Sequence, residues 1–186
     1  MLNERRQFRE RDLPAGQKTE REAAECLLKW LNARTTQKYE VVEVQDDSNH
    51  KTTHYDFKIS NGIKSYTYEV KDDKRSEHTG NFFIEFEDSG KPSCLSITTA
   101  DFHIFKSCGY FYKIQTTRIH RLLKVLGAHG ELETKRVCRK WDDGRINRAS
   151  YRDGYIVPTK YVTKQSVCLN PSLDSSSSSG GTSLGV

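Results

Sequence analysis

Hydrophobic and polar residues follow a helical spacing near the N-terminus of the 186-residue chain. The apolar positions recur every three or four residues, at Ala24, Leu27, Leu28 and Leu31. This spacing predicts an amphipathic helix over 19–33. The sequence Thr19-x-x-Glu22 at its start predicts a capping box, in which the Glu22 side chain bonds the backbone. Glu20 falls at the end of the apolar stripe, which is an unusual place for a carboxylate.

Period-two alternation predicts a series of β-strands further along the chain. These strands are expected over 39–45, 55–59, 66–70, 81–87 and 110–115. Asn61-Gly62 stands between the second and third strands, and this dipeptide between alternating segments is the strongest short-range signal for a β-hairpin. Two further helices are expected over 98–109 and 117–126.

This order of elements predicts a mixed α/β fold with an antiparallel hairpin at the centre of its sheet and helices beside it. The length suits one domain, which we expect over 16–170. Residues 1–15 are dense in charge and are expected to form a loose arm, and the Ser/Gly-rich segment 171–186 a disordered tail. The segments 46–53 and 129–152 carry no clear period and are expected to be loops.

The composition argues against several classes of protein. No apolar run approaches the roughly 18 residues of a membrane span, and the N-terminus lacks an apolar signal region, so neither membrane insertion nor secretion is expected. The five cysteines contain no Cys-x-x-Cys pair, which argues against a disulfide scaffold and a zinc ribbon and favours reduced thiols. These features predict a cytoplasmic protein.

The predicted hairpin brings two acidic residues to one face. With a two-residue turn at Asn61-Gly62, Phe57 pairs with Tyr66, and Asp56 then lies diagonal to Glu69. Because side chains alternate along a strand, both carboxylates emerge on one face and the aromatic side chains on the other. Diagonal neighbours lie about 7–8 Å apart, which is near enough for two carboxylates to bind one cation.

Oxygen ligands of this kind suit Mg²⁺ or Mn²⁺, whereas zinc would require His or Cys. Lys71 follows Glu69 by two residues and shares its face, where it could orient or deprotonate a water or stabilise developing charge. The pattern indicates metal-assisted hydrolysis of a phosphodiester. An acid-x-Lys triplet alone is a weak signal, because the chain holds four of them, and the solvated face of any hairpin shows the same alternation.

These residues resemble the PD-(D/E)XK nuclease superfamily, in which a helix bearing Glu precedes a hairpin bearing Asp and (Asp/Glu)-x-Lys. The matching segments are Gly16-x-x-x-Glu20, His54-Tyr55-Asp56 and Glu69-Val70-Lys71, and the segments 80–85, 96–102 and 154–158 resemble parts of phage-encoded and bacterial members. Tyr55 stands where the family has proline. The resemblance spans about 16–163 and implies a restriction-endonuclease-like mixed β-sheet.

The resemblance also assigns roles to the residues of the predicted site. Asp56 and Glu69 would bind the divalent cation, Mg²⁺ or Mn²⁺. Lys71 would serve the attacking water, and Glu20 would hold or position the metal from the opposite wall. A Glu in a first helical turn also complements the helix dipole, which is an alternative role for Glu20. Glu85, on the next strand, is either an outer carboxylate of the site or part of an exposed strand face, and the exposed face is the preferred interpretation.

Positive charge is concentrated in one part of the chain. The net charge is +5, and residues 113–164 hold 13 Lys or Arg against five Asp or Glu. A field of this sign suits a polyanion such as nucleic acid, although an ordinary solvated surface has a similar composition. Under the resemblance we expect this half to bind DNA phosphates. The candidate contacts are Arg118, Arg121 and Lys124 on one side of a helix, with Arg139 and Lys140 beside Trp141.

The sequence therefore predicts a small Mg²⁺-dependent DNA endonuclease of phage or bacterial type, acting in the host-cell cytoplasm if a phage encodes it. Three alternatives stay open: a catalytically silent DNA-binding module on the same fold, an RNA-cleaving nuclease, and an ordinary α/β protein with an acidic hairpin face. Structure-selective cleavage, as by a junction resolvase, and a homodimer that cuts two strands are both compatible with the resemblance. The residues do not distinguish duplex, flap, junction and single-stranded substrates.

Overall fold

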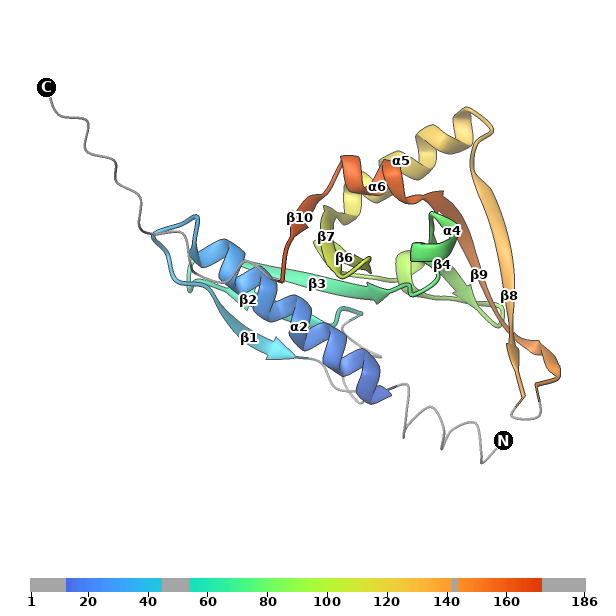
Figure 1. The fold of residues 1–186 in the computed structure, drawn as a ribbon, viewed down its shortest axis with the longest axis horizontal. Helices are drawn as coiled ribbons and strands as arrows, with labels where there is room; N and C mark the ends of the chain where they lie inside the picture. The colour runs from blue at the N-terminus through green and yellow to red at the C-terminus, as the bar shows by residue number, and fades with distance from the viewer. Residues whose placement is uncertain (1–12, 45–53, 142–143, 172–186) are drawn as a thin grey trace, which may run out of the picture.

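The computed structural model describes residues 13–44, 54–141 and 144–171, which form a mixed α/β fold with two β-sheets (Figure 1). Its described helices are α2 (Leu13–Asn32), α4 (Ser76–Thr79), α5 (Thr116–Ala128) and α6 (Thr159–Lys164), with a 3-10 turn at Cys94–Ser96. The mixed α/β class predicted from the sequence is confirmed.

The larger sheet has six strands in the order β1-β2-β3-β6-β7-β10. Its strands are β1 (Glu40–Val44), β2 (Phe57–Ser60), β3 (Ser65–Asp72), β6 (Phe102–Ser107), β7 (Tyr110–Gln115) and β10 (Val167–Leu169). All neighbouring strands are antiparallel except β3 and β6, which run parallel at the middle of the sheet.

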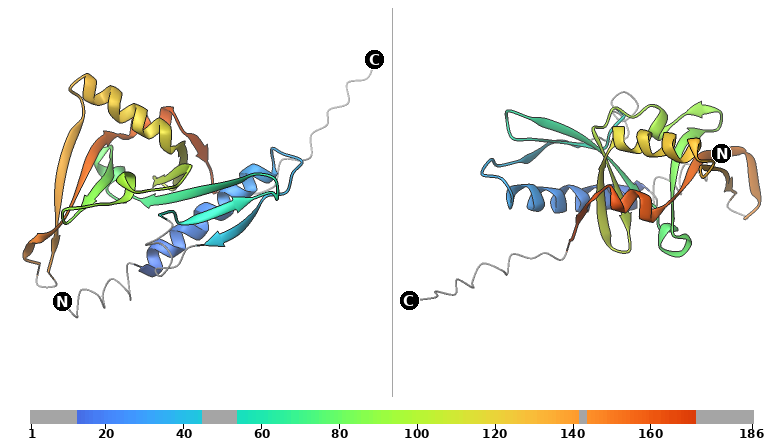
Figure 2. Two further views of the ribbon diagram at one scale, coloured as in Figure 1. Left: turned by 180° about the vertical axis from the view of Figure 1, so that it is seen from behind. Right: turned by 90° about the horizontal axis from the view of Figure 1, so that it is seen from above.

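The smaller sheet has four antiparallel strands in the order β5-β4-β9-β8. They are β4 (Asn81–Asp88), β5 (Lys91–Pro92), β8 (Glu133–Lys140) and β9 (Ile146–Pro158). Residues 146–151 of β9 lie beyond the part of this strand that pairs with β4, so the β8–β9 hairpin forms an arm at the edge of the molecule (Figures 1 and 2).

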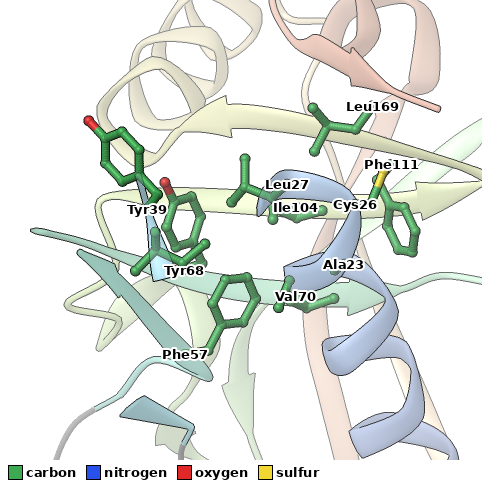
Figure 3. Packing of buried hydrophobic residues seen from close by; sticks show 12 residues of the cluster. Ala23, Cys26, Leu27, Tyr39, Phe57, Tyr68, Val70, Ile104, Phe111 and Leu169 are labelled. Atoms are coloured by element: carbon green, nitrogen blue, oxygen red, sulfur yellow. The ribbon is translucent and has the colours of Figure 1, made fainter. Parts of the chain in front are cut away.

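Helix α2 covers one face of the larger sheet. Ala23 and Leu27 lie on its buried stripe and pack against Val70 and Tyr68 of β3 and Ile104 of β6 (Figure 3). All five side chains are at most 8% exposed, which makes this contact one of the two hydrophobic cores. The second core lies between β4, β9 and α5 and contains the other face of β6.

The β2–β3 hairpin has a longer turn than predicted. Ser60 pairs with Ser65 and Phe57 with Tyr68, so four residues, 61–64, connect the strands. The Asn61 side chain explains this turn, because its Oδ1 accepts hydrogen bonds from the N–H groups of Ile63 and Lys64 at 3.0 and 2.7 Å. The pairing differs from the predicted register by two residues, and a shift of two leaves every side chain on its predicted face.

The capping box predicted at Thr19 is wrong. The helix begins at Leu13, with Pro14 in its first turn, where the missing N–H costs no hydrogen bond. Thr19 is buried within the helix and donates to the Asp72 carboxylate at 3.0 Å. Glu22 accepts a hydrogen bond from the Lys106 ammonium at 2.7 Å. Both side chains therefore bond residues of the larger sheet and do not cap the helix.

The helix predicted over 98–109 is also wrong, because β6 occupies the middle half of this segment. His103, Ile104 and Phe105 are all buried, as expected for a central strand covered on both faces. A short apolar run of this kind has no period that distinguishes a strand from a buried helix.

The segment predicted as a loop over 129–152 contains β8 and the start of β9. The strands over 81–87 and 110–115 and the helix over 117–126 are confirmed as β4, β7 and α5. Leu13–Ala15 belong to α2 and not to the predicted arm. The rest of that arm, the loop over 46–53 and nearly all of the predicted tail lie outside the described residues.

No helix in the described part of the chain is long and apolar enough to cross a membrane.

Gly154 provides a test of the packing between β4 and β9. A Cβ atom at this position would meet the Phe83 ring at 2.5 Å and the carbonyl oxygen of Ile84 at 3.0 Å. We expect Gly154→Ala to lower the free energy of unfolding by about 1–3 kcal/mol, the usual cost of overpacking. Urea unfolding would measure this loss.

Gly127→Ala in α5 is the matched control. A Cβ at Gly127 would meet only a side-chain methyl of Leu132 at 3.8 Å. Because alanine favours the helix by up to about 1 kcal/mol, this variant should be as stable as the wild type or more stable. Equal stability of the two variants would contradict the close packing at Gly154.

Candidate active site

Asp56 and Glu69 lie beside one another on the β2–β3 hairpin. Asp56 comes directly before β2, whose first residue Phe57 pairs with Tyr68, and the Asp56 N–H donates to the Tyr68 carbonyl at 2.8 Å. The two carboxylic residues are 8% and 2% exposed. The Asp56 carboxylate also accepts a hydrogen bond from the Val70 N–H at 2.6 Å, which holds it against β3.

Lys71 completes the group on the same face of β3. Its ammonium lies 2.5 Å from Glu69 Oε1, and its side chain is 31% exposed. Burial lowers the pKa of Lys71, but the negative charges of Glu69 and Asp56 and the hydrogen bond to Glu69 outweigh this effect and raise the pKa well above its usual value. The lysine is therefore a stable cation next to two carboxylates.

His103 lies next to this group on β6, where it is the strand partner of Glu69. Its ring is fully enclosed, and Nδ1 lies 3.0 Å from Thr116 Oγ1. The Thr116 hydroxyl donates its proton to the Ala100 carbonyl at 2.6 Å, so Nδ1 of His103 must be the donor to Thr116. Burial, reinforced by the charge of Lys71, lowers the pKa of His103 to about 3. The ring is neutral at physiological pH.

Glu85 approaches the site from the smaller sheet. Its side chain is 13% exposed and accepts a hydrogen bond from Ser93 Oγ at 2.6 Å, with Arg152 Nε 3.5 Å away. Burial is the main reason that the pKa of the neighbouring Cys94 thiol is raised. The charges of Lys71 and Glu85 also affect this pKa, which places Cys94 near both of them. The exposed strand face preferred for Glu85 in the sequence analysis is therefore wrong: this carboxylate is enclosed near Lys71.

Glu20 lies on the other side of β3. Thr19, its neighbour on α2, contacts Asp72, and Asp72 alternates with Lys71 along the strand. Glu20 is half-buried, and its Oε1 packs over Gly16 one turn earlier. The helix thus places Glu20 near the end of β3 but on the α2 face, so its part in the site stays a prediction.

An open cleft of about 490 Å³ begins at Lys71 and runs along the smaller sheet. One side consists of the end of β3 and the connection to α4, including Arg75. The other side is the inner face of β4, β9 and β8, including Glu85, Arg152 and Lys135. The sequence pattern did not single out Arg75 or Arg152, because only the arrangement of the two sheets in space brings them to the site.

The five cations predicted to bind DNA lie on two elements, α5 and β8. Arg118, Arg121 and Lys124 are exposed on α5, and none of them lines the cleft at Lys71. Arg139 on β8 forms an ion pair with Asp88 at 2.5 Å, and Lys140 is exposed near the end of the arm. The structure therefore does not gather the five residues into one surface beside the hairpin.

The side chains of the site supply two of the oxygen ligands that a hard divalent cation would need. Among the described residues, no three His, Cys, Asp or Glu side chains converge as a metal-binding group. Asp56 and Glu69 nevertheless supply buried oxygen donors on adjacent strands. Mg²⁺ commonly binds through one or two carboxylates and completes its shell with water and substrate phosphate, so two are sufficient.

Comparison of the chain with models of protein families, with curated proteins and with solved structures finds no match.

The buried His103 predicts a dependence of stability on pH. Its pKa is about 3 in the folded protein and 6.5 without the fold, so the unfolded chain binds a proton first as the pH falls. The stability is complete above pH 6.5 and is lost toward pH 3. We expect the wild type to lose about 2 kcal/mol more than His103→Asn between pH 7 and pH 5.

Urea unfolding of both proteins at several values of pH would measure this difference. His103→Asn removes the titrating ring and keeps a side-chain amide that is able to bond Thr116, so the comparison cancels the titration of other groups. Parallel stability curves for the two proteins would show that His103 is not buried in the neutral form.

Proposed function

We propose that this chain is a metal-dependent nuclease that hydrolyses phosphodiester bonds in DNA. The observation that carries the proposal is the group formed by Asp56, Glu69 and Lys71. Two carboxylates that are less than one-tenth exposed lie near each other on the β2–β3 hairpin, with an ammonium at 2.5 Å from one of them. Lys71 of this group lines a cleft large enough for part of a polymer substrate.

Burial of these charges argues against a merely solvated hairpin face. Removing an ionised carboxylate from water is costly unless hydrogen bonds, an opposite charge or a metal compensate. One structural ion pair would need only Glu69 and Lys71. The additional carboxylate of Asp56, held by the Val70 N–H, adds the second oxygen ligand that a Mg²⁺ site would use.

Each residue of the group has a distinct role in the proposed reaction. Asp56 and Glu69 would hold Mg²⁺ or Mn²⁺. A bound divalent cation supplies Lewis-acid activation of the phosphate and a more acidic water. Lys71, as a cation at the mouth of the cleft, would orient the attacking water or stabilise the charge that develops on the phosphate oxygens. Glu85 would act from further away, by positioning groups around Lys71.

The arrangement of elements supports a restriction-endonuclease-like fold in some respects and departs from it in others. Helix α2, then the β2–β3 hairpin with its carboxylates, then β6 parallel to β3 follow the expected order. The connection from β3 to β6, however, contains α4, β4 and β5 where the family pattern has a helix. The proposal of this fold rests on the hairpin and on α2.

DNA is the proposed substrate because of the resemblance of the hairpin motifs and the positive charge of residues 113–164. RNA cleavage is the second candidate. The same hairpin chemistry would act on either backbone, so the substrate panel must include both. A homodimer that cuts two strands stays a proposal drawn from the resemblance.

The function is tested with supercoiled, linear, single-stranded and four-way-junction DNA, and with RNA, in Mg²⁺, Mn²⁺ or EDTA. We expect cleavage of DNA that requires the cation. Asp56→Asn, Glu69→Gln and Lys71→Ala should each lower the rate at least about 100-fold, the usual effect of removing one charge-stabilising or acid–base group.

Lys74→Ala is the matched control, because Lys74 ends another acid-x-Lys triplet, Asp72-x-Lys74, but is exposed and does not line the cleft. This variant should cleave like the wild type. Cleavage in EDTA, or an active Lys71→Ala variant, would contradict the mechanism. Binding without cleavage would favour the silent DNA-binding module, and cleavage of RNA alone would change the substrate.

A further inference from the structure

The cleft at Lys71 has a charge distribution that identifies what it binds. Its two sides come from different parts of the fold, the end of β3 with α4 on one side and strands β4, β8 and β9 of the smaller sheet on the other (Figures 1 and 2). Four basic and four acidic side chains line it. What a ligand would meet there depends on which of these side chains already have partners within the protein.

Three carboxylates of the cleft are occupied by donors of the protein. Asp72 accepts the Thr19 hydroxyl at 3.0 Å. Asp73 accepts the backbone N–H groups of Arg75 and Phe83 at 3.1 and 2.8 Å. These bonds fix the β3–α4 connection to both α2 and β4. The two carboxylates therefore hold the walls of the cleft together.

Glu85 is the third of these carboxylates. It accepts the Ser93 hydroxyl at 2.6 Å and lies 3.5 Å from Arg152 Nε. Arg152 is also 4.0 Å from Asp88, and its side chain is 45% exposed. The two acids hold the guanidinium of Arg152 at the side of the cleft while nearly half of the side chain still faces solvent.

Arg75 and Lys135 differ from these residues. Both side chains are exposed, and neither has a side-chain ion pair or hydrogen bond to any other residue of the described chain. Arg75 lies on the β3–α4 side, and Lys135 lies on β8, where Glu133, Lys135 and Val137 alternate toward the cleft. Glu133 is the one exposed acid in the lining for which the described residues supply no partner.

The charged lining residues without a partner among the described residues are therefore two exposed cations, Arg75 and Lys135, one on each side, and one acid, Glu133. Lys71, paired with Glu69, lies at one end of the cleft. Positive side chains spaced along a groove suit the regularly spaced phosphates of a nucleic-acid backbone. The exposed face of α5 also carries cations, Arg121 and Lys124, but neither of them lines the cleft at Lys71.

We propose that this cleft binds the phosphate backbone of the substrate strand, with Arg75 and Lys135 on its two sides and Arg152 as a third contact, and that α5 does not. This inference rests on the proposed nuclease function and names its substrate-binding surface. Such contacts hold the backbone next to Lys71 and read no base sequence.

The test compares two double variants matched in charge, residue type and exposure: Arg75→Ala with Lys135→Ala, and Arg121→Ala with Lys124→Ala. Fluorescence anisotropy measures binding of single-stranded and duplex DNA in EDTA, at several salt concentrations. We expect the cleft variant to bind more weakly and to lower the slope of log K against log salt by about two, because each lost phosphate contact removes about one. The α5 variant should keep the wild-type slope.

Cleavage in Mg²⁺ is measured on the same proteins, and the cleft variant should show a higher KM. If the wild type binds and cleaves but the cleft variant retains its slope, the inference is wrong and the nuclease proposal stands. Equal losses in both pairs, or a loss only in the α5 pair, overturn it as well. A wild type that neither binds nor cleaves any nucleic acid refutes the proposed function itself.

The single variant Lys135→Ala is the control for loss of folding, because this side chain is exposed on an edge strand and its removal should leave the stability unchanged. It should unfold at the wild-type urea concentration and lower the slope by about one. Arg152→Lys, which keeps the charge, should retain more affinity than Arg152→Ala. Equal affinity of these two variants with the wild type would exclude Arg152 from the binding surface.

Discussion

The alternation of side chains along β3 is the constraint on which the rest of the structure depends. Tyr68 and Val70 face α2 and form one hydrophobic core, while Glu69 and Lys71 face the other side. Because β3 lies between β2 and β6, both of its edges are paired, and α2 covers one of its faces. A slip of one residue would place a carboxylate and an ammonium under α2 and move two core residues out of it, so the register is strongly determined.

The polar side of β3 adds little to the stability of the fold. A buried ion pair such as Glu69 with Lys71 contributes little net stability, because desolvation offsets most of the attraction. The protein retains this pair together with Asp56 and the neutral His103, each held by its own hydrogen bond. A well-packed apolar group would often be as stable, so the presence of this polar set supports a chemical role for it.

The two sheets have different roles in the proposed enzyme. The larger sheet holds the reacting group in a rigid register, and the smaller sheet provides the facing side of the cleft. Glu85 connects the two, since it lies near Lys71 and also holds Arg152. Three acids of the cleft accept hydrogen bonds within the protein, whereas Arg75 and Lys135 are exposed on its two sides and would meet a polyanionic ligand. This arrangement joins the proposed chemistry to the proposed substrate surface.

Local pattern alone determined the amphipathic helix, the hairpin and the common face of Asp56, Glu69 and Lys71. That last prediction survived a turn two residues longer than expected, because the period of a strand is two. The tertiary structure decided what local pattern leaves open. It made 102–107 a central strand, gave Thr19 and Glu22 distant partners, and enclosed Glu85 near Lys71. A sequence pattern shows which face a side chain occupies, but what covers that face depends on contacts between segments far apart in the chain.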